Sequence, residues 1–467
     1  MPQAFGPVAH GLIGLYLISL LAVPRAPTSI AALACLAALA AGFHQWREDA
    51  RAGFRHMAVL VVPAAVYLMH IVLQILAGVA APHLASQVLI GLLTLALGLS
   101  GVPGRLPDVR RWILPAAALG AIASCLLALY QLWILDILRP YGWLGGAAIG
   151  NGAIKFGDLS AVQALLAFVL VLTAADKARR LLGLLGLFCG VLALALTQTR
   201  GGILGLLLAV GVLGWALSAR RWSNATDRDR NDYPGHDPGH HAEPVRQGKA
   251  VPGTASPVKR GGHRRATSLA VMALAVLLSL SAAAFMQDRF ASIEPQVQRY
   301  LRGDIDSEVG QRLALWRAAL LAGIHQPLTG VGFGRFENEL KRQSAAGLTP
   351  ASEKILYGQA HSEYLSAFAE AGVTGFVALT LMFVAPMIAM LRQIRAGRGS
   401  PAALAALVTS AAFAGFALTD DMFDRQITVI AFFFLNAWFL RAAWGPGSGS
   451  ETAGARPAPR RPPEVAG

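Results

Sequence analysis

Residues 159–219 read LSAVQALLAFVLVLTAADKARRLLGLLGLFCGVLALALTQTRGGILGLLLAVGVLGWALSA and consist of three long apolar runs separated by short polar breaks. The runs lie at 159–175, 181–198 and 202–219. A helix needs roughly 20 mainly apolar residues to cross a bilayer, and each run approaches that length. Because hydrocarbon offers no water to pair with the backbone, such runs cross membranes as helices. This stretch therefore predicts transmembrane helices.

The same pattern recurs along the 467-residue chain. Further apolar runs lie at 8–23, 29–44, 57–79, 84–100, 113–134, 267–286, 366–391, 401–418 and 426–441. Hydrophobic residues make up 55% of the chain and charged residues only 14%, whereas charged residues are typically about a quarter of a soluble domain. We predict an all-α polytopic membrane protein with about 12 transmembrane helices.

Basic residues predict the orientation of the helices. When the N-terminus is placed in the cytoplasm, alternate loops carry basic clusters, as the positive-inside rule requires. The clusters are Arg47, Arg51 and Arg55; Arg105, Arg110 and Arg111; Lys177, Arg179 and Arg180; and Arg392, Arg395 and Arg398. We therefore expect both termini in the cytoplasm and attribute the net charge of +14 to topology, not to nucleic-acid binding. The first run is expected to be a retained helix, not a cleaved signal peptide.

Two segments lack hydrophobic periodicity and are rich in charge, proline and glycine, which predicts a disordered cytoplasmic loop at 220–266 and tail at 443–467. The loop contains three irregularly spaced histidines, a pattern more typical of a solvated run than of a metal site: His236, His240 and His241. All three cysteines fall inside apolar runs without C-x-x-C spacing, which predicts packing roles: Cys35, Cys125 and Cys189. The predicted organisation is helices 1–8 in 1–219, the loop, helix 9 in 267–286, a periplasmic subdomain in 287–365, helices 10–12 in 366–442, and the tail.

The polar segment 287–365 carries helical signals of its own. Four apolar residues repeat at helical spacing, and a proline and three glycines then break the chain into a loop: Leu313, Trp316, Leu320 and Leu321, followed by Pro327, Gly330, Gly332 and Gly334. We predict a helical periplasmic subdomain that lies against the membrane helices and roofs a cavity between them. The loop sequence TGVGFGRF follows no predicted strand and lacks a Gly-Lys-Ser/Thr ending, which excludes a nucleotide loop.

Four residues are candidates for chemistry on the outer side. His361 stands where the polar segment meets the next apolar run; it is either a structural histidine or a base that accepts a substrate proton near neutral pH. Arg200 ends an apolar run, where an arginine can simply snorkel to the interface. Arg289 and Arg312 are predicted on the same side. If the three arginines converge, their guanidinium groups can hold an anion such as a diphosphate.

Acidic residues raise the question of a metal. Two groups have spacing compatible with Mg²⁺ or Mn²⁺, namely Asp304 with Asp306, and Asp420 with Asp421 and Asp424. Short acidic turns are common without a metal, and arginines can neutralise a diphosphate by themselves. We expect no metal and no cofactor.

Four motifs in this order resemble the O-antigen ligase (WaaL) family, within the superfamily shared with O-antigen polymerases and bacterial protein O-oligosaccharyltransferases. The motifs are the outward Arg200, R-L-x-L-W-R-A-A-L from Arg312, H-x-P-L-x-G-V-G-x-G-x-F ending at Phe336, and H-S-E-Y-L-x-x-x-x-E-x-G from His361 to Gly372. Ser362 stands where the family commonly has asparagine.

The resemblance implies a GT-C-like glycosyltransferase in the inner membrane of a Gram-negative bacterium, with its active site facing the periplasm. It implies an undecaprenyl-diphosphate-linked O-antigen as donor and lipid A-core as acceptor, without a metal. His361 would then be the catalytic base, and Arg200, Arg289 and Arg312 would bind the diphosphate. The supporting residues are Glu363, Tyr364, Glu370 and Gly332. A polymerase and a transporter are the alternatives; the transporter is disfavoured because polar groups collect at the outer face instead of mid-membrane.

Overall fold

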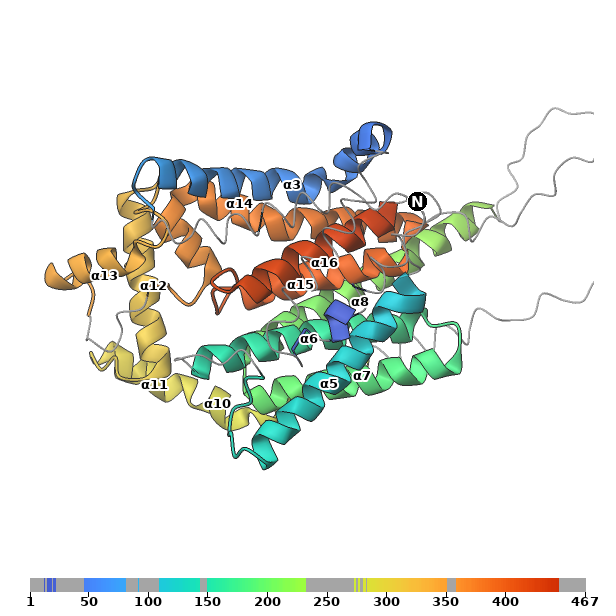
Figure 1. The fold of residues 1–467 in the computed structure, drawn as a ribbon, viewed down its shortest axis with the longest axis horizontal. Helices are drawn as coiled ribbons and strands as arrows, with labels where there is room; N and C mark the ends of the chain where they lie inside the picture. Colours follow the sequence, from blue (N-terminus) through green and yellow to red (C-terminus); the bar gives the residue numbers. More distant parts are fainter. Residues whose placement is uncertain are drawn as a thin grey trace, which may run out of the picture.

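A computed structural model describes residues 46–80, 109–142, 149–231, 284–350 and 358–444, with isolated positions near 12–21, at 91 and near 273–282. Within these ranges every regular element is a helix and no strand occurs, so the predicted all-α class is confirmed. The long helices run side by side as one elongated bundle, and a group of shorter helices lies at one end of it (Figure 1).

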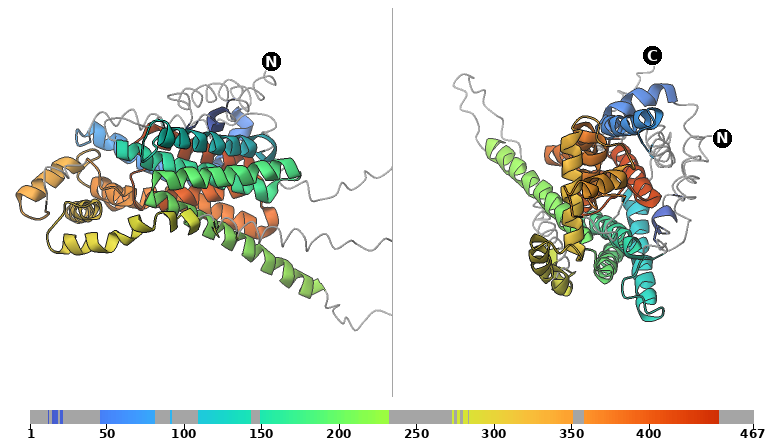
Figure 2. Two further views of the ribbon diagram at one scale, coloured as in Figure 1. Left: turned by 90° about the horizontal axis from the view of Figure 1, so that it is seen from below. Right: turned by 90° about the vertical axis from the view of Figure 1, so that its left-hand side faces the viewer.

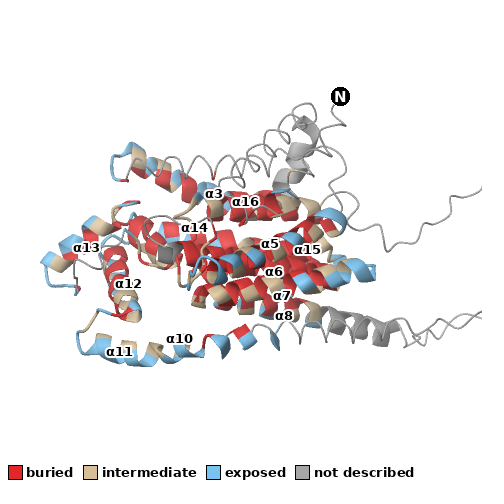
Figure 3. Ribbon diagram, turned by 60° about the horizontal axis from the view of Figure 1, so that its bottom comes forward, coloured by how far each residue is buried: buried red, intermediate tan, exposed pale blue. Residues whose placement is uncertain are grey.

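The bundle contains eight long helices in the described part of the chain. They are α3 (Trp46–Leu76), α5 (Leu114–Trp133) with a short π-helical start η3 (Val109–Ile113), α6 (Ile149–Thr173), α7 (Lys177–Thr197), α8 (Arg200–Asn231), α14 (Glu363–Gln393) followed by η5 (Ile394–Arg398), α15 (Pro401–Phe416) and α16 (Gln426–Trp444). Burial is greatest at the centre of the bundle, as Figure 3 shows.

Seven of these helices are long and apolar enough to span a membrane, and α15 is a shorter apolar helix. All eight correspond to predicted runs. The predicted runs at 8–23, 29–44, 84–100 and 267–286 lie largely outside the described residues, so the total of about 12 stays a prediction. The backbone of α8 continues to Asn231, past the expected boundary at 219, whereas 232–266 and 445–467 lie outside the described residues.

Small residues let the membrane helices approach closely. On α7, a Cβ at Gly186 would lie 2.7 Å from the Cβ of Ala118 on α5, and one at Gly190 would lie 2.7 Å from the Cβ of Ala164 on α6. In membranes such contacts hold helices together because lipid provides little hydrophobic drive between them. The predicted packing role of Cys125 agrees with its buried position on α5.

The segment predicted as a helical subdomain does form helices at the end of the bundle (Figure 2). They are α10 (Gln287–Ala291), α11 (Ile293–Leu301), α12 (Glu308–His325) and α13 (Phe336–Ala345). Both α11 and α13 expose much of their surface (Figure 3).

The apolar repeat of 313–321 does form a helix, α12, whose buried face consists mostly of small residues. Its buried positions are mostly alanines and glycines, whereas Leu320 is exposed. The reason is close packing against α14, where a Cβ at Gly323 would lie 2.3 Å from the ring of Phe368. Small side chains therefore form most of the contact between α12 and α14.

Candidate active site

A break in α14 anchors the glycine-rich loop. Gly372 has φ 64° and ψ −159°, which interrupts the helix and frees nearby carbonyl groups from their helical partners. The amide of Gly332 donates to the Glu370 carbonyl at 3.0 Å. Gly332 itself has φ 100°, and a Cβ there would lie 2.8 Å from the Val79 carbonyl oxygen. Gly332 thus allows a close backbone approach that a larger residue would prevent.

Glu370 and Gln74 hold this loop in place. The buried carboxylate of Glu370 accepts a hydrogen bond from the Gly334 amide at 2.9 Å. On α3, the Gln74 side chain donates to the Glu370 carbonyl at 3.0 Å and accepts from the Phe333 amide at 2.8 Å. These contacts join α3, the loop and α14 into one unit.

His361 immediately precedes α14 and has an uncommon backbone conformation. Its φ is 53°, in the left-handed region that non-glycine residues seldom adopt and that clusters at functional sites. The next residues are tied to the loop 417–425, because the Glu363 amide donates to the Ala417 carbonyl at 3.0 Å. In return, the Phe423 amide donates to the Glu363 carboxylate at 2.9 Å. The Tyr364 hydroxyl donates to the Ala414 carbonyl at 3.2 Å.

His361 faces a buried carboxylate whose charge is balanced by a lysine. Its Nδ1 lies 3.5 Å from Oδ1 of Asp420, and Lys155 Nζ of α6 lies 2.5 Å from Oδ2 of the same residue. Lys155 also lies 3.2 Å from Asp424. Burial raises the pKa of Asp420, but Lys155 and His361 outweigh burial and bring that pKa below its ordinary value. Asp420 therefore stays ionised at neutral pH and can stabilise a protonated imidazole.

Three groups here have the spacing of metal ligands. One ligand atom each from His361, Asp420 and Asp421 lie within 4.8 Å of one another. However, the Lys155 ammonium already pairs with Asp420 and donates to the Asp421 carbonyl. A resident ammonium beside the same carboxylate fits poorly with a second cation there, because like charges at this range repel.

The D-x-D pair lies in a local turn away from this cluster. Asp304 pairs with Arg299 at 2.6 Å and accepts a hydrogen bond from the Asp306 amide at 2.9 Å. Both contacts are exposed. These local contacts give the two aspartates a structural role in the turn.

The structure gathers the predicted arginines around Glu308 at the start of α12. Arg200 donates to the Arg289 carbonyl at 2.6 Å and to the Ser292 hydroxyl at 3.2 Å, and the Arg289 guanidinium pairs with Glu308 at 3.2 Å. Burial raises the pKa of Glu308, yet four positive charges outweigh burial and lower that pKa. These belong to Arg289, Arg200, Arg312 and Arg139. We call these four arginines the arginine cluster.

Arg312 connects the arginine cluster to the histidine. Its guanidinium donates to the carbonyl of Thr419, the residue directly before Asp420. The loop 417–425 therefore touches both groups, with Arg312 at one residue and His361 at the next. Since the loop joins α15 to α16, these two helices fix its position.

Sequence reasoning missed three members of this site. Lys155, Arg139 and Glu308 were not singled out. For Lys155 a signal was present, because a charged residue at the edge of an apolar run is a functional candidate by default. Its partner Asp420 stands 265 positions away in the sequence, so the pairing itself had no local signal.

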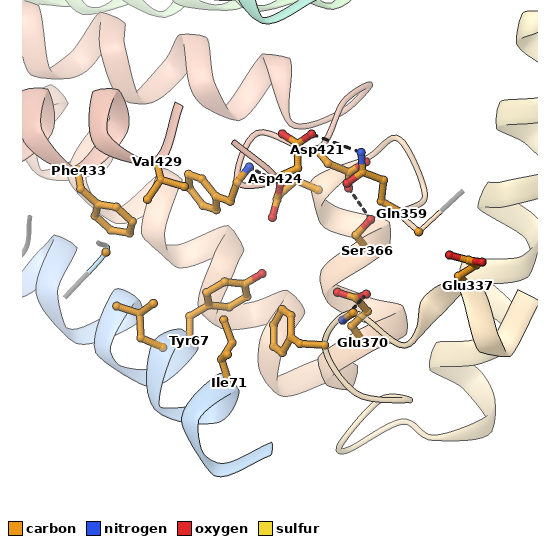
Figure 4. A pocket seen from close by; sticks show the side chains of 17 residues that line it. Tyr67, Ile71, Glu337, Gln359, Ser366, Glu370, Asp421, Asp424, Val429 and Phe433 are labelled. Atoms are coloured by element: carbon orange, nitrogen blue, oxygen red, sulfur yellow. Dashed lines mark hydrogen bonds between the residues drawn. The ribbon is translucent and has the colours of Figure 1, made fainter. Parts of the chain in front are cut away.

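A cavity of about 380 Å³ opens beside this site. It lies between α3, α14, α16, the glycine-rich loop and the loop 417–425. The close-up in Figure 4 shows side chains that point into it. Glu363 and Glu370, two of the predicted supporting residues, line it. Phe333, Gly334 and Glu337 line it from the region predicted to roof a cavity.

Comparison with known proteins agrees with the motifs. Residues 185–380 match the sequence model of the family described as O-antigen ligase. This part of the chain is therefore similar to the O-antigen ligase family. The matched segment includes Arg200, Arg289, Arg312 and His361 but ends before Asp420. The resemblance seen in the motifs is thereby confirmed.

A second similarity, to a single relative, extends over more of the chain. An uncharacterized protein of Haemophilus influenzae is 20% identical over 290 residues, which cover 62% of this chain and 62% of that relative. Together, the family match and the apolar helices support a multi-pass membrane protein of the O-antigen ligase and polymerase superfamily.

Proposed function

We propose that this protein is an O-antigen ligase of the Gram-negative inner membrane. It transfers O-antigen from undecaprenyl diphosphate to a sugar hydroxyl of lipid A-core, at the periplasmic face and with inversion at the anomeric carbon. The observation that carries the proposal is the loop 417–425, where Thr419 contacts Arg312 and Asp420 faces His361. A base and an anion clamp therefore meet on adjacent residues.

His361 acts as the general base. It takes the proton of the acceptor hydroxyl on Nε2, since Nδ1 is directed at Asp420. The acceptor oxygen attacks the anomeric carbon from the side opposite the diphosphate. The new carbon–oxygen bond forms as the bond to the diphosphate oxygen breaks, and that oxygen leaves with the electron pair. Asp420 stabilises the imidazolium until the proton returns to solvent.

The arginine cluster stabilises the departing undecaprenyl diphosphate. Negative charge grows on the leaving oxygen, and guanidinium groups are suited to bind phosphate oxygens in a bidentate manner. Such preorganised charge is commonly the largest contribution to lowering a barrier. Arg200, Arg289 and Arg312 serve this role without a nucleotide sugar, a metal or another cofactor, in a GT-C-like membrane enzyme.

Transfer by purified protein tests the proposal. The donor is a lipid-linked glycan, the acceptor is lipid A-core or a second lipid-linked glycan, and each reaction is run with and without EDTA. We expect product on lipid A-core at the same rate in EDTA. Lengthened lipid-linked chains would instead indicate a polymerase, and transport of the lipid-linked glycan without any product would indicate a transporter. Loss of product in EDTA would contradict the metal-free mechanism.

The His361→Ala variant tests the base. We expect the turnover number to fall by about 10²- to 10⁴-fold, the usual contribution of a general base, while donor binding stays normal. The matched control is His325→Ala, which removes an exposed histidine at the end of α12. Turnover near that of the wild type in His361→Ala would refute the assignment.

A further inference from the structure

The cavity beside His361 has the size and the lining of a small-molecule site. Its volume of about 380 Å³ lies within the usual range for ligand pockets, about 300–1,000 Å³. One wall is apolar and includes the aromatic rings of Phe333, Phe423 and Phe433. Such aromatic faces can bind the C–H surface of a sugar ring or a hydrocarbon chain. The polar wall of the cavity therefore distinguishes between these two kinds of ligand.

The polar wall carries carboxyl groups. Glu363, Glu370, Asp421 and Asp424 all line the cavity, and no lysine, arginine or histidine is found among its described lining residues. This wall therefore offers a phosphate no positive charge, in contrast to the arginine cluster on the other side of Asp420. Carboxylates accept hydrogen bonds from hydroxyl and ammonium groups, which a hydrocarbon chain lacks.

Two buried polar groups in the cavity have bonding capacity to spare. Tyr67 of α3 is only 5% exposed, and its hydroxyl points into the cavity (Figure 4) without a hydrogen-bond partner among the described residues. Asp421 is 3% exposed; its Oδ1 accepts from the Ser366 hydroxyl at 2.5 Å, and its Oδ2 has no partner in the described part of the chain. Because buried polar groups are nearly always hydrogen-bonded, both indicate a ligand with hydroxyl groups.

The cavity comes close to the proposed base through Asp421, although His361 itself is not among its lining residues. Ligand atoms of His361 and Asp421 lie within 4.8 Å of each other, and Asp421 lines the cavity. A sugar bound between Tyr67 and Asp421 would therefore present a hydroxyl toward the imidazole. A hydroxyl can donate to the Asp421 carboxylate and accept from Tyr67, which matches the two groups that lack partners.

Resting on the proposed function, we infer that this cavity is the acceptor subsite, and that it takes an uncharged or amino-bearing sugar and excludes a phosphorylated one. The donor diphosphate and the acceptor sugar thus enter from sides of opposite charge. A lipid chain as occupant is the competing outcome of the test below.

Binding to the protein in nanodiscs tests the inference without requiring transfer. The probes are three synthetic glycosides with the same short alkyl chain, ending in glucose, glucosamine or glucose 6-phosphate, with the matching alkanol as the apolar probe. We expect the first two to bind by isothermal titration and the phosphorylated probe to bind at least tenfold more weakly. Equal binding of all three glycosides, or equally tight binding of the alkanol, would overturn the inference.

Two conservative variants address the polar wall. Tyr67→Phe keeps the ring and removes one donor, so we expect about tenfold weaker binding of the glucose probe, the effect of one hydrogen bond. Asp421→Asn removes charge; we expect weaker binding of the glucosamine probe and a smaller penalty for the phosphorylated one. This opposite response separates recognition from a general structural defect. Tyr130→Phe, at an exposed position on α5, should change nothing. Unchanged affinities in both Tyr67→Phe and Asp421→Asn would contradict the inference.

The binding experiment and the transfer assay can refute the two proposals independently. If the probes discriminate by charge but no transfer is seen, the ligase proposal falls and a sugar-binding cavity remains. If transfer to lipid A-core occurs and the probes do not discriminate, the ligase proposal stands and the acceptor subsite lies elsewhere.

Discussion

The two sides of the loop 417–425 have opposite charge. On one side, the arginine cluster surrounds the carboxylate of Glu308 and holds the loop through Thr419. On the other side, carboxyl groups line a cavity that is otherwise largely apolar and aromatic. Only the step from Thr419 to Asp420 separates the two. If the proposed function holds, this one short loop keeps an anionic donor and a hydroxyl-bearing acceptor apart while both reach His361.

Lys155 balances the charge of the buried carboxylates of Asp420 and Asp424 with its ammonium group. We expect Lys155→Ala to have the largest effect on the protein. It leaves Asp420 and Asp424 buried without their cation, and breaking a buried ion pair typically costs about 3–5 kcal/mol. The apparent melting temperature in detergent should fall by many degrees and transfer should be lost. Lys177→Ala, which removes an exposed lysine at the start of α7, is the control.

The same variant also sharpens the question of a metal. Once the ammonium is gone, His361, Asp420 and Asp421 retain the spacing of ligands, so we expect Lys155→Ala to gain affinity for Mn²⁺ over the wild type. Electron paramagnetic resonance of Mn²⁺ titrated into each protein measures this directly. A wild type that binds Mn²⁺ as tightly as the variant would show that Lys155 does not take the place of a metal.

The carboxyl group of Asp421 makes the stability of the folded protein depend on pH. Burial raises the pKa of Asp421 to about 6, and the nearby Asp420 charge adds to this effect. Because the folded state favours the protonated form, the stability from this group is fully present below pH 4 and is lost as pH rises toward 6. The difference is about 3 kcal/mol for a shift of this size. We expect Asp421→Asn to gain melting temperature over the wild type as pH rises from 4 to 7.

Asp306→Asn is the control for this pH series, since Asp306 is exposed in a turn. It should follow the wild type throughout. A constant difference between Asp421→Asn and the wild type across the series would mean that Asp421 does not titrate in this range. Charged and titratable groups surround Asp421 in both proteins, namely Lys155, His361, Glu363, Asp420 and Asp424.

The cationic side should show a smaller effect, confined to donor binding. On the proposed mechanism, replacement of Arg312 or Arg200 by alanine removes one charged contact to the diphosphate. Such a contact is worth about 1.5–3 kcal/mol, or roughly ten- to a hundredfold in the dissociation constant. Binding of undecaprenyl diphosphate to each variant measures it, with Arg302→Ala as an exposed control. Normal donor binding by both variants would leave Arg200 and Arg312 as structural residues, bonded to Arg289 and Thr419.

Local patterns in the sequence predicted the elements of the fold but not its contacts. Apolar runs indicated each of the long helices, because the length of a spanning segment is set by the bilayer. The apolar repeat predicted the helix α12 but not its buried face, where alanines and Gly323 pack and Gly323 meets Phe368 of α14. Which face a helix buries depends on its neighbour, and the neighbour is not visible in a local repeat.

Topology alone predicted which candidate residues lie on the same side of the membrane. The positive-inside rule assigned His361, Arg200, Arg289 and Arg312 to one side, and the arginines do gather around Glu308. The ion pair of Lys155 with Asp420 and the cavity at Tyr67 join segments far apart in sequence. Such pairings depend on how α3, α6 and α16 pack together, and no motif records that packing.

The most direct measurement is an experimental structure of the protein with undecaprenyl diphosphate bound, in which the position of the two phosphorus atoms decides the matter. We expect phosphate oxygens within about 4 Å of the guanidinium groups of Arg200, Arg289 and Arg312, the usual limit for an ion pair. The cavity lined by Tyr67 and Asp421 should hold no phosphate. A diphosphate found among those carboxyl groups, or bound away from all three arginines, would contradict the separation of charge on which the proposed mechanism depends.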